Sequence, residues 1–128
     1  MDLISIVEAE RNLEDVLNLV ANGKQRFLLS DKKRFHAALL STEDLELLRT
    51  IDNKKQNATK VSFNSLRGKL RERIGTLADD GKRVIVTRNG TDLAALVPVR
   101  DVETLVGLDD AIDLQAARRL LEQQLGSE

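Results

Sequence analysis

One pattern of residues occurs twice in this chain at an offset of 57 positions, and this repeat constrains the fold more than any other feature. The segment from Ile4 to Leu48 and the segment from Val61 to Leu105 carry the same landmarks in the same order. We therefore interpret the chain as an internal tandem repeat. Identical pairs include Ser5 and Ser62, Leu13 and Leu70, Arg26 and Arg83, Ala37–Leu39 and Ala94–Leu96, and Asp44 and Asp101.

The second copy shows the pattern of each unit most clearly. Val61–Phe63 alternates as a short strand does, and an apolar residue then recurs every three or four positions, which predicts one face of an α-helix. Asn64 or Ser65 is expected to cap that helix. Asn89-Gly90 is a strong hairpin signal because both residue types tolerate positive φ. The helical face comprises Leu66, Leu70, Ile74 and Leu77, the hairpin strands are expected at 83–87 and 93–97, and a second short helix at Val99 or Arg100.

The first copy predicts the same series of elements. A strand is expected at 3–7, a helix at about 9–22, and hairpin strands at 25–30 and 35–40. Ser41-Thr42 followed by two acids is typical of a helix start. Leu45, Leu47 and Leu48 are expected on the buried side of that helix.

These patterns predict an α+β fold of two β-α-β-β-α repeats that form a pseudo-twofold pair, plus a C-terminal helix. The expected units are a first repeat at 1–51, a polar linker at 52–60, a second repeat at 61–105 and a helical arm at 106–128. One repeat is too small to bury a full core, so pairing must supply the rest. The sequence leaves open whether the repeats pair within a chain, between chains, or both.

Composition excludes several classes of function. The chain has no cysteine, so disulfides, cysteine-based zinc sites and thiol nucleophiles are excluded. His36 is the single histidine and has no partner spaced for catalysis or metal binding. The acidic pairs Asp79-Asp80 and Asp109-Asp110 are explained as helix ends, and Gly81-Lys82 lacks the spacing of a P-loop. We therefore expect no enzyme activity, no metal and no cofactor. With no signal peptide and no apolar run of about twenty residues, a cytoplasmic protein that does not span a membrane is expected.

Charge is unevenly distributed, although the formal net charge is −1. Residues 1–57 carry nine basic and ten acidic side chains, residues 58–105 nine and six, and residues 106–128 two and five, which gives −1, +3 and −3. A basic middle followed by an acidic tail suits a nucleic-acid contact followed by a protein-binding arm, although asymmetry of this size also arises by chance.

The second copy contains the run "R-x-x-L…G-K-x-V-I-V-T-R-N-G…A-A-L-V-P…D-V-E-x-L", which covers about forty-five residues. In this run the chain resembles the prevent-host-death (Phd/YefM) antitoxin family. The tail, "LDDAIDLQAARRLLEQ", is also similar to the tails of that family. The resemblance implies paired N-terminal domains that bind operator DNA and a tail that wraps around a toxin.

The same resemblance implies a set of DNA-binding residues. Basic residues near the start of the first helix and at the hairpin are the usual contacts, and the planar guanidinium of arginine can hold phosphate or guanine through two bonds. In the first copy, however, Glu10 and Asp31 occupy the positions of Arg67 and Arg88, so that copy is expected to keep only a pairing role unless Lys32-Lys33-Arg34 contacts the DNA backbone. A solvated helix face is the alternative explanation of the cations. The DNA-binding residues implied are Arg67, Arg88, Lys69, Arg71 and Lys60.

The tail is expected to form a helix with a wide apolar stripe. Under the resemblance this stripe binds the toxin through Leu108, Ile112, Ala116, Leu120, Leu121 and Leu125. We therefore expect an antitoxin of a type II toxin–antitoxin system that neutralises a toxin, expected to be a ribonuclease, and represses its own operon. Its partners would be the toxin, operator DNA and itself, as an intrachain pseudo-dimer or a homodimer. The alternative is an antitoxin-derived protein-interaction module that does not bind DNA.

Overall fold

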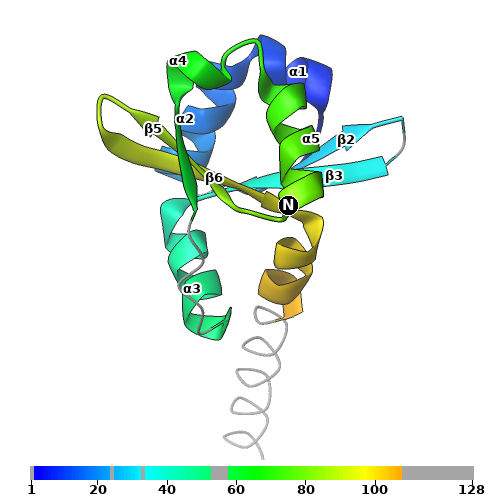
Figure 1. The fold of residues 1–128 in the computed structure, drawn as a ribbon, viewed down its shortest axis with the longest axis vertical. Coiled ribbons are helices and arrows are strands. Elements are labelled where there is room, and N and C mark those ends of the chain that lie inside the picture. Colours follow the sequence, from blue (N-terminus) through cyan, green and yellow to red (C-terminus); the bar gives the residue numbers. More distant parts are fainter. Residues whose placement is uncertain (1, 24, 33, 53–57, 108–128) are drawn as a thin grey trace, which may run out of the picture.

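The computed structural model describes residues 2–23, 25–32, 34–52 and 58–107. They form a mixed α+β fold with one six-stranded sheet between two layers of helices (Figure 1). The elements are β1 (Asp2–Ser5), α1 (Ile6–Arg11), α2 (Leu13–Gly23), β2 (Phe27–Asp31), β3 (Arg34–Leu40), α3 (Thr42–Asp52), β4 (Thr59–Ser62), α4 (Phe63–Leu66), α5 (Leu70–Asp80), β5 (Val84–Arg88), β6 (Thr91–Pro98) and a helix at 99–107.

The strand order in the sheet is β1-β2-β3-β6-β5-β4. The edge strands β1 and β4 run parallel to their neighbours, β2 and β5, and the two hairpins are antiparallel. The antiparallel pairing of β3 with β6 joins the first half of the chain (2–52) to the second half (58–107). Leu39 lies opposite Leu96 at the centre of that pairing.

Strand pairing in the second half repeats that in the first half with 57 added to each residue number. Asp2 lies opposite Phe27, and Thr59 lies opposite Val84. Both hairpins also shift register at the same place, between Leu29 and Ser30 in one and between Val86 and Thr87 in the other. The two halves therefore contribute equivalent strands in the same relative positions.

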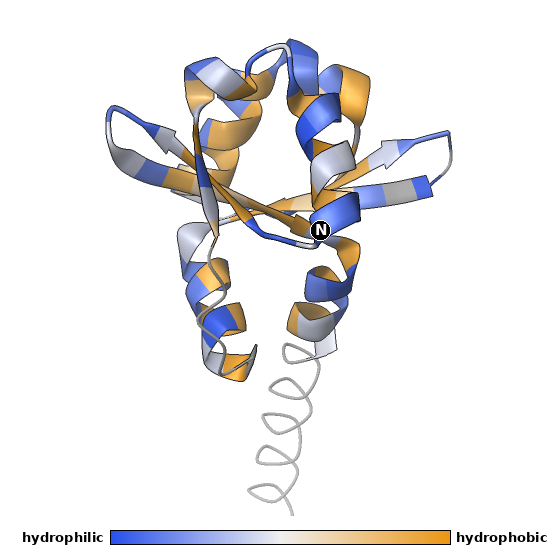
Figure 2. Cartoon of the chain, viewed as in Figure 1, coloured by the Kyte–Doolittle hydropathy of each residue, from blue (hydrophilic) through white to orange (hydrophobic). Residues whose placement is uncertain are grey.

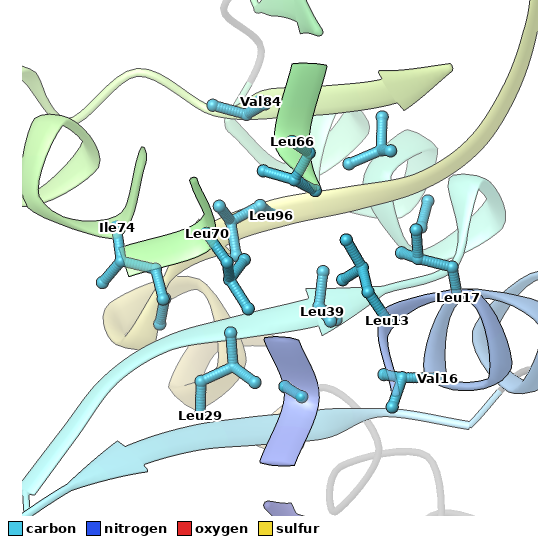
Figure 3. Close-up of a cluster of buried hydrophobic side chains, with 14 of the residues drawn as sticks. Leu13, Val16, Leu17, Leu29, Leu39, Leu66, Leu70, Ile74, Val84 and Leu96 are labelled. Atoms are coloured by element: carbon cyan, nitrogen blue, oxygen red, sulfur yellow. The ribbon is translucent and has the colours of Figure 1, made fainter. Parts of the chain in front are cut away.

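The larger core lies between one face of the sheet and helices α1, α2, α4 and α5 (Figure 1). Apolar faces of these helices turn toward the sheet (Figure 2), and side chains from both halves meet there (Figure 3). Leu39 and Leu96 are fully buried at its centre. Because burial of apolar surface drives folding, this shared interior holds the halves together. The labelled members are Leu13, Val16, Leu17, Leu29, Leu39, Leu66, Leu70, Ile74, Val84 and Leu96.

The opposite face of the sheet is covered by α3 and the helix at 99–107. Leu45 and Leu48 of α3 are buried there with Val102 and Leu105 of the last helix. Leu47 was expected beside them, but 44% of it is exposed, so that prediction is wrong. Positions 45 and 48 are one turn apart on the buried face, and 47 points away from it.

The long first helix predicted in each half is wrong, because each is two shorter helices joined by a break. In the first half α1 ends at Arg11, and the amide side chain of the next residue, Asn12, donates to the carbonyl oxygen of Glu8 at 3.3 Å. In the second half Gly68 adopts a φ of 77° between α4 and α5, a conformation that glycine adopts at little cost. The apolar period continues across both breaks, so periodicity alone could not reveal them.

The helix starts also differ from the prediction. Ser62 rather than Asn64 or Ser65 caps α4, and its Oγ accepts from the backbone N of Ser65 at 3.2 Å. Ser5 caps α1 in the same way, accepting from Glu8 N at 3.0 Å. A serine hydroxyl at this position pairs with a free amide of the first helical turn.

Several boundaries move by a few residues. Phe63, expected in a strand, begins α4, and the polar linker predicted at 52–60 is shortened because α3 includes Asp52 and β4 begins at Thr59. The remaining stretch, 53–57, lies outside the described residues. The hairpin prediction is confirmed: Asn89 and Gly90 adopt φ values of 52° and 79° between β5 and β6.

Candidate functional site

The residues expected to bind DNA all lie in the second half of the chain: four are in or beside helices α4 and α5 or at the end of β5, and the fifth is on the edge strand β4 (Figure 1). Arg67 follows α4 directly, Lys69 precedes α5, and Arg71 is in the first turn of α5. Arg88 ends β5 at the hairpin, and Lys60 lies on the edge strand β4. The fold thus places these cations on one half, but their partners separate them into two groups.

Arg71 forms an ion pair with the first half of the chain. Its Nη1 donates to Oδ2 of Asp31, at the end of β2, over 2.6 Å. This side-chain hydrogen bond lowers the pKa of the Asp31 carboxyl below its usual value of 3.8, with help from the positive charge of Arg71 and against a smaller effect of desolvation. Asp31 is therefore ionised and paired at neutral pH.

Arg88 forms a second ion pair with the first half. Its Nη1 donates to Oε1 of Glu14, in the first turn of α2, over 3.0 Å. Its guanidinium carbon also lies 5.1 Å from the centre of the Phe63 ring, a cation–π geometry. Both arginines named as DNA contacts at these positions are therefore already bound to carboxylates.

The two ion pairs are one contact made twice with its charges exchanged. The offset of 57 places Arg71 at the position of Glu14 and Arg88 at the position of Asp31. Each pair therefore joins the hairpin of one half to the second helix of the other half. The sequence carried this signal, because residues at equivalent positions in two pairing units have opposite charges.

Arg67 and Lys69 remain available for a ligand. Both side chains are exposed, and within the described part of the chain neither forms an ion pair. Lys60 is exposed too, and its Nζ lies 3.5 Å from Oδ1 of Asp92. A contact of that length at the surface holds the lysine weakly.

A hollow of about 220 Å³ lies where the break between α1 and α2 meets α4. The first half contributes three carboxylates to its wall, and the second half contributes Phe63 and Arg67. Its charges are mixed and it opens to solvent, which suits hydrated polar contacts better than an enclosed small molecule. The lining residues are Glu10, Arg11, Asn12, Leu13, Glu14, Asp15, Phe63 and Arg67.

Two further ion pairs, not expected from the sequence, connect α3 and the helix at 99–107 to residues that precede β2 and β5. Arg26 Nε lies 2.9 Å from Asp44 Oδ2, and Arg83 Nε lies 2.9 Å from Asp101 Oδ2. The Arg83 side chain is only 4% exposed, against 20% for Arg26. These pairs hold α3 and the helix at 99–107 in place. The sequence signal for these pairs is that arginine and aspartate each recur at the offset of 57.

His36 lies on β3 with an exposed side chain, and Asp79 and Asp80 are the last two residues of α5. Asp80 Oδ1 accepts from the backbone N of Lys82 at 2.8 Å, a role at the helix end. Within the described residues, no three histidine or acidic side chains are grouped so as to hold a metal ion. None of the helices described there is both long and apolar enough to cross a membrane.

The residues expected to bind a toxin, Leu108, Ile112, Ala116, Leu120, Leu121 and Leu125, and the acidic pair Asp109-Asp110 lie outside the described residues. Comparison of the chain with protein-family models, curated proteins and solved structures found no match.

Proposed function

We propose that the chain is an antitoxin of a type II toxin–antitoxin system, similar to the Phd/YefM family. It binds a toxin, expected to be a ribonuclease, through the arm that starts at Leu108, and it represses its own operon through the paired domains. The two halves are proposed to be copies of one unit related by a pseudo-twofold axis, so that a single chain takes the place of a family dimer.

The observation that carries this proposal is the sharing of one sheet by two halves with the same order of pairing. Leu39 lies opposite Leu96 at the junction, and the pairings on either side agree at an offset of 57. A family dimer is expected to join two identical units in the same way. The helix at 99–107 leads directly to Leu108, where the proposed arm begins.

Co-expression with the product of the adjacent reading frame tests the antitoxin function. If that product arrests growth, the full chain is expected to restore growth, and a chain ending at Gly107 is expected to fail because it lacks the apolar stripe. Circular dichroism of the truncated chain checks that the described domain still folds. Rescue by the truncated chain would remove the arm from the toxin-binding site.

DNA binding is proposed to depend on the second half alone, chiefly on Arg67 and Lys69. Both are exposed cations in the stretch between α4 and α5. Lys69 directly precedes α5, where phosphate is favoured by the backbone amides and by charge, and Arg67 follows α4 two residues earlier. The first half has Glu10 and Asn12 at these positions, which offer no positive charge. One chain would therefore contact one half-site, and two chains would be needed to cover a palindrome.

A salt titration of binding to the DNA upstream of the gene tests this proposal. Neutralising Arg67 and Lys69 together is expected to weaken binding and to reduce the salt slope by roughly one to two. The matched control neutralises Arg71 and Arg88, which already have carboxylate partners, and is expected to change the slope less. Equal losses in both variants would place all four residues in the site.

A second function has a specific observation in its favour: an antitoxin-derived interaction module that does not bind DNA. Arg71 and Arg88 are neutralised by Asp31 and Glu14, which lowers the positive potential of the helical face. Under this hypothesis the wild-type chain binds its upstream DNA no more tightly than unrelated DNA, whereas rescue by the full chain is unchanged. The same titration, run with both DNAs, separates the two functions.

A further inference from the structure

The two ion pairs between the halves have a consequence for which halves can associate. In the chain as it is, the acidic pair Glu14 and Asp31 of the first half faces the basic pair Arg71 and Arg88 of the second. Were two first halves to meet through the same surface, each Asp31 would face a Glu14. Two second halves would bring each Arg88 against an Arg71. Both like pairings replace two attractions with two repulsions.

The apolar seam between β3 and β6 does not make this distinction. Leu40 lies opposite Ala95, and Ala38 lies opposite Val97. At the same register, two first halves would place Ala38 opposite Leu40, and two second halves would place Ala95 opposite Val97. Every combination sets a small side chain against a larger one, so no like pairing at these positions forces two large side chains together.

We propose that Glu14, Asp31, Arg71 and Arg88 form a charge code that restricts this surface to unlike halves. The partner that fits the second half is an acidic first half, from the same chain or from a second copy that exchanges halves reciprocally. Association of like halves is opposed by charge, which is how specificity is obtained when the attractive surface alone cannot discriminate. This inference does not depend on the proposed function.

The code can be removed without losing either ion pair within the chain and without changing the net charge. In Asp31→Arg/Arg71→Glu, residue 31 still faces an opposite charge at 71, and Glu14 still faces Arg88. Each half then carries one acid and one base, so each becomes complementary to itself. The proposal requires that like halves can now associate between chains.

The experiment refolds the full chain from denaturant at low salt and about 1 mM, near the effective concentration that a short linker provides. Sedimentation velocity then measures the fraction in dimers and larger species. Asp31→Arg/Arg71→Glu is expected to raise the ratio of oligomer to monomer on the order of tenfold over wild type, given two surface contacts reversed in sign. Every variant can also form dimers by reciprocal exchange of unlike halves, and these dimers set the baseline oligomer fraction.

The matched control reverses all four residues, as Glu14→Arg/Asp31→Arg/Arg71→Glu/Arg88→Glu. It keeps the same net charge and restores the code with its sign inverted, so its oligomer fraction is expected to return to the wild-type value. Refolding in 1 M salt, where the Debye length is about 3 Å, is expected to remove the difference between variants. Circular dichroism confirms that each one has folded.

A wild-type oligomer fraction in Asp31→Arg/Arg71→Glu would overturn the proposal, as would equal oligomerisation of the fourfold variant. Glu14→Arg/Arg88→Glu is the mirror variant and makes each half self-complementary through the other ion pair. It replaces Asp31→Arg/Arg71→Glu if that variant fails to fold, and the same two outcomes decide the proposal.

Discussion

The two halves of this chain agree in their strands and core and differ in the charges of their exposed helical faces. Leu13 and Leu70 are buried at equivalent positions, as are Leu39 and Leu96. Glu14 and Arg71, one residue further along in the same helices, have opposite charges and bind across the interface. Buried positions are constrained by close packing, whereas exposed positions tolerate most substitutions. Two similar halves can therefore acquire separate roles at their exposed contacts without disturbing the shared core.

The ion pairs Arg26–Asp44 and Arg83–Asp101 offer the strongest test of whether the two halves contribute equally to stability. Asp101→Asn removes the carboxylate that pairs with Arg83 Nε, and because the Arg83 side chain is 4% exposed, losing this partner of a buried pair is expected to cost about 3–5 kcal/mol. Asp44→Asn is expected to cost less, because Arg26 is 20% exposed and can be hydrated. Urea unfolding measures both variants. Equal costs would show that the difference in burial has no energetic effect.

Substitutions at the centre of the core should lower the free energy of unfolding equally in either half. Leu39→Ala and Leu96→Ala each remove a fully buried side chain where β3 meets β6, and each is expected to cost about 2–5 kcal/mol. Leu47→Ala, at an exposed position of α3, is the control and should change stability little. Unfolding free energies that differ strongly between the two leucines would show that one half dominates the shared interior.

The two hairpin tips place different residue types at an equivalent position in the left-handed region. Lys32 has a φ of 49°, and Asn89 occupies the equivalent position with a φ of 52°. Asparagine tolerates this conformation better than lysine, so Lys32→Asn is expected to raise stability by roughly 0.5–1 kcal/mol. The reciprocal variant, Asn89→Lys, should lower it by a similar amount. Thermal unfolding measures both changes, and changes of the same sign would contradict the explanation.

Reversing the charge of one partner in the Glu14–Arg88 ion pair should have a small, salt-dependent effect on stability. Glu14→Arg sets a guanidinium against Arg88, and because this pair is exposed the expected cost is about 0.2–1 kcal/mol. Adding Arg88→Glu should restore most of the loss. The cost of the single variant, measured as a change in melting temperature, should shrink at high salt, and a cost unaffected by salt would indicate lost packing against Phe63 instead.

The smallest expected effect is the change in the pKa of Asp31 between the folded state, where its carboxyl is paired, and the unfolded state, where it is free. Its pKa is held below 3.8 by the hydrogen bond from Arg71, so the stability that it contributes is present above pH 3.8 and is lost as the pH falls through the lowered pKa. A carbon-detected NMR titration should report that lowered value. Arg71→Met should return the pKa toward 3.8, and no change would remove the pair as its cause.

The sequence predicted the strands better than the helices. Hairpins at Asn89-Gly90 and around Lys32 could be recognised because turn residues and β-branched runs are local signals. The breaks at Asn12 and Gly68 could not, since an apolar period continues when a short turn replaces part of a helix. Leu47 was misplaced for a related reason: adjacent leucines do not reveal which of them faces the sheet.

For the candidate site, the sequence identified the cations but not their partners. Arg71 and Asp31 are forty residues apart in the sequence, and they come within hydrogen-bonding distance because the two halves pack together. The sequence shows opposite charges at Asp31 and Arg88, which are related by the offset of 57, but it does not show that each residue forms an ion pair with the other half. Arg67 and Lys69 are exposed, and their role in DNA binding stays a prediction.

Because β3 pairs with β6, β3 remains without its second neighbour during biosynthesis until β6 has been made. When Leu40 has been added to the growing chain, β3 has a neighbour in β2 on one side only, and Pro98 is 58 residues away. At a translation rate of about 5–20 residues per second, roughly 3–12 s pass before β6 has been made. Throughout that interval the nascent chain presents a leucine- and alanine-rich strand edge, the kind of surface that chaperones recognise.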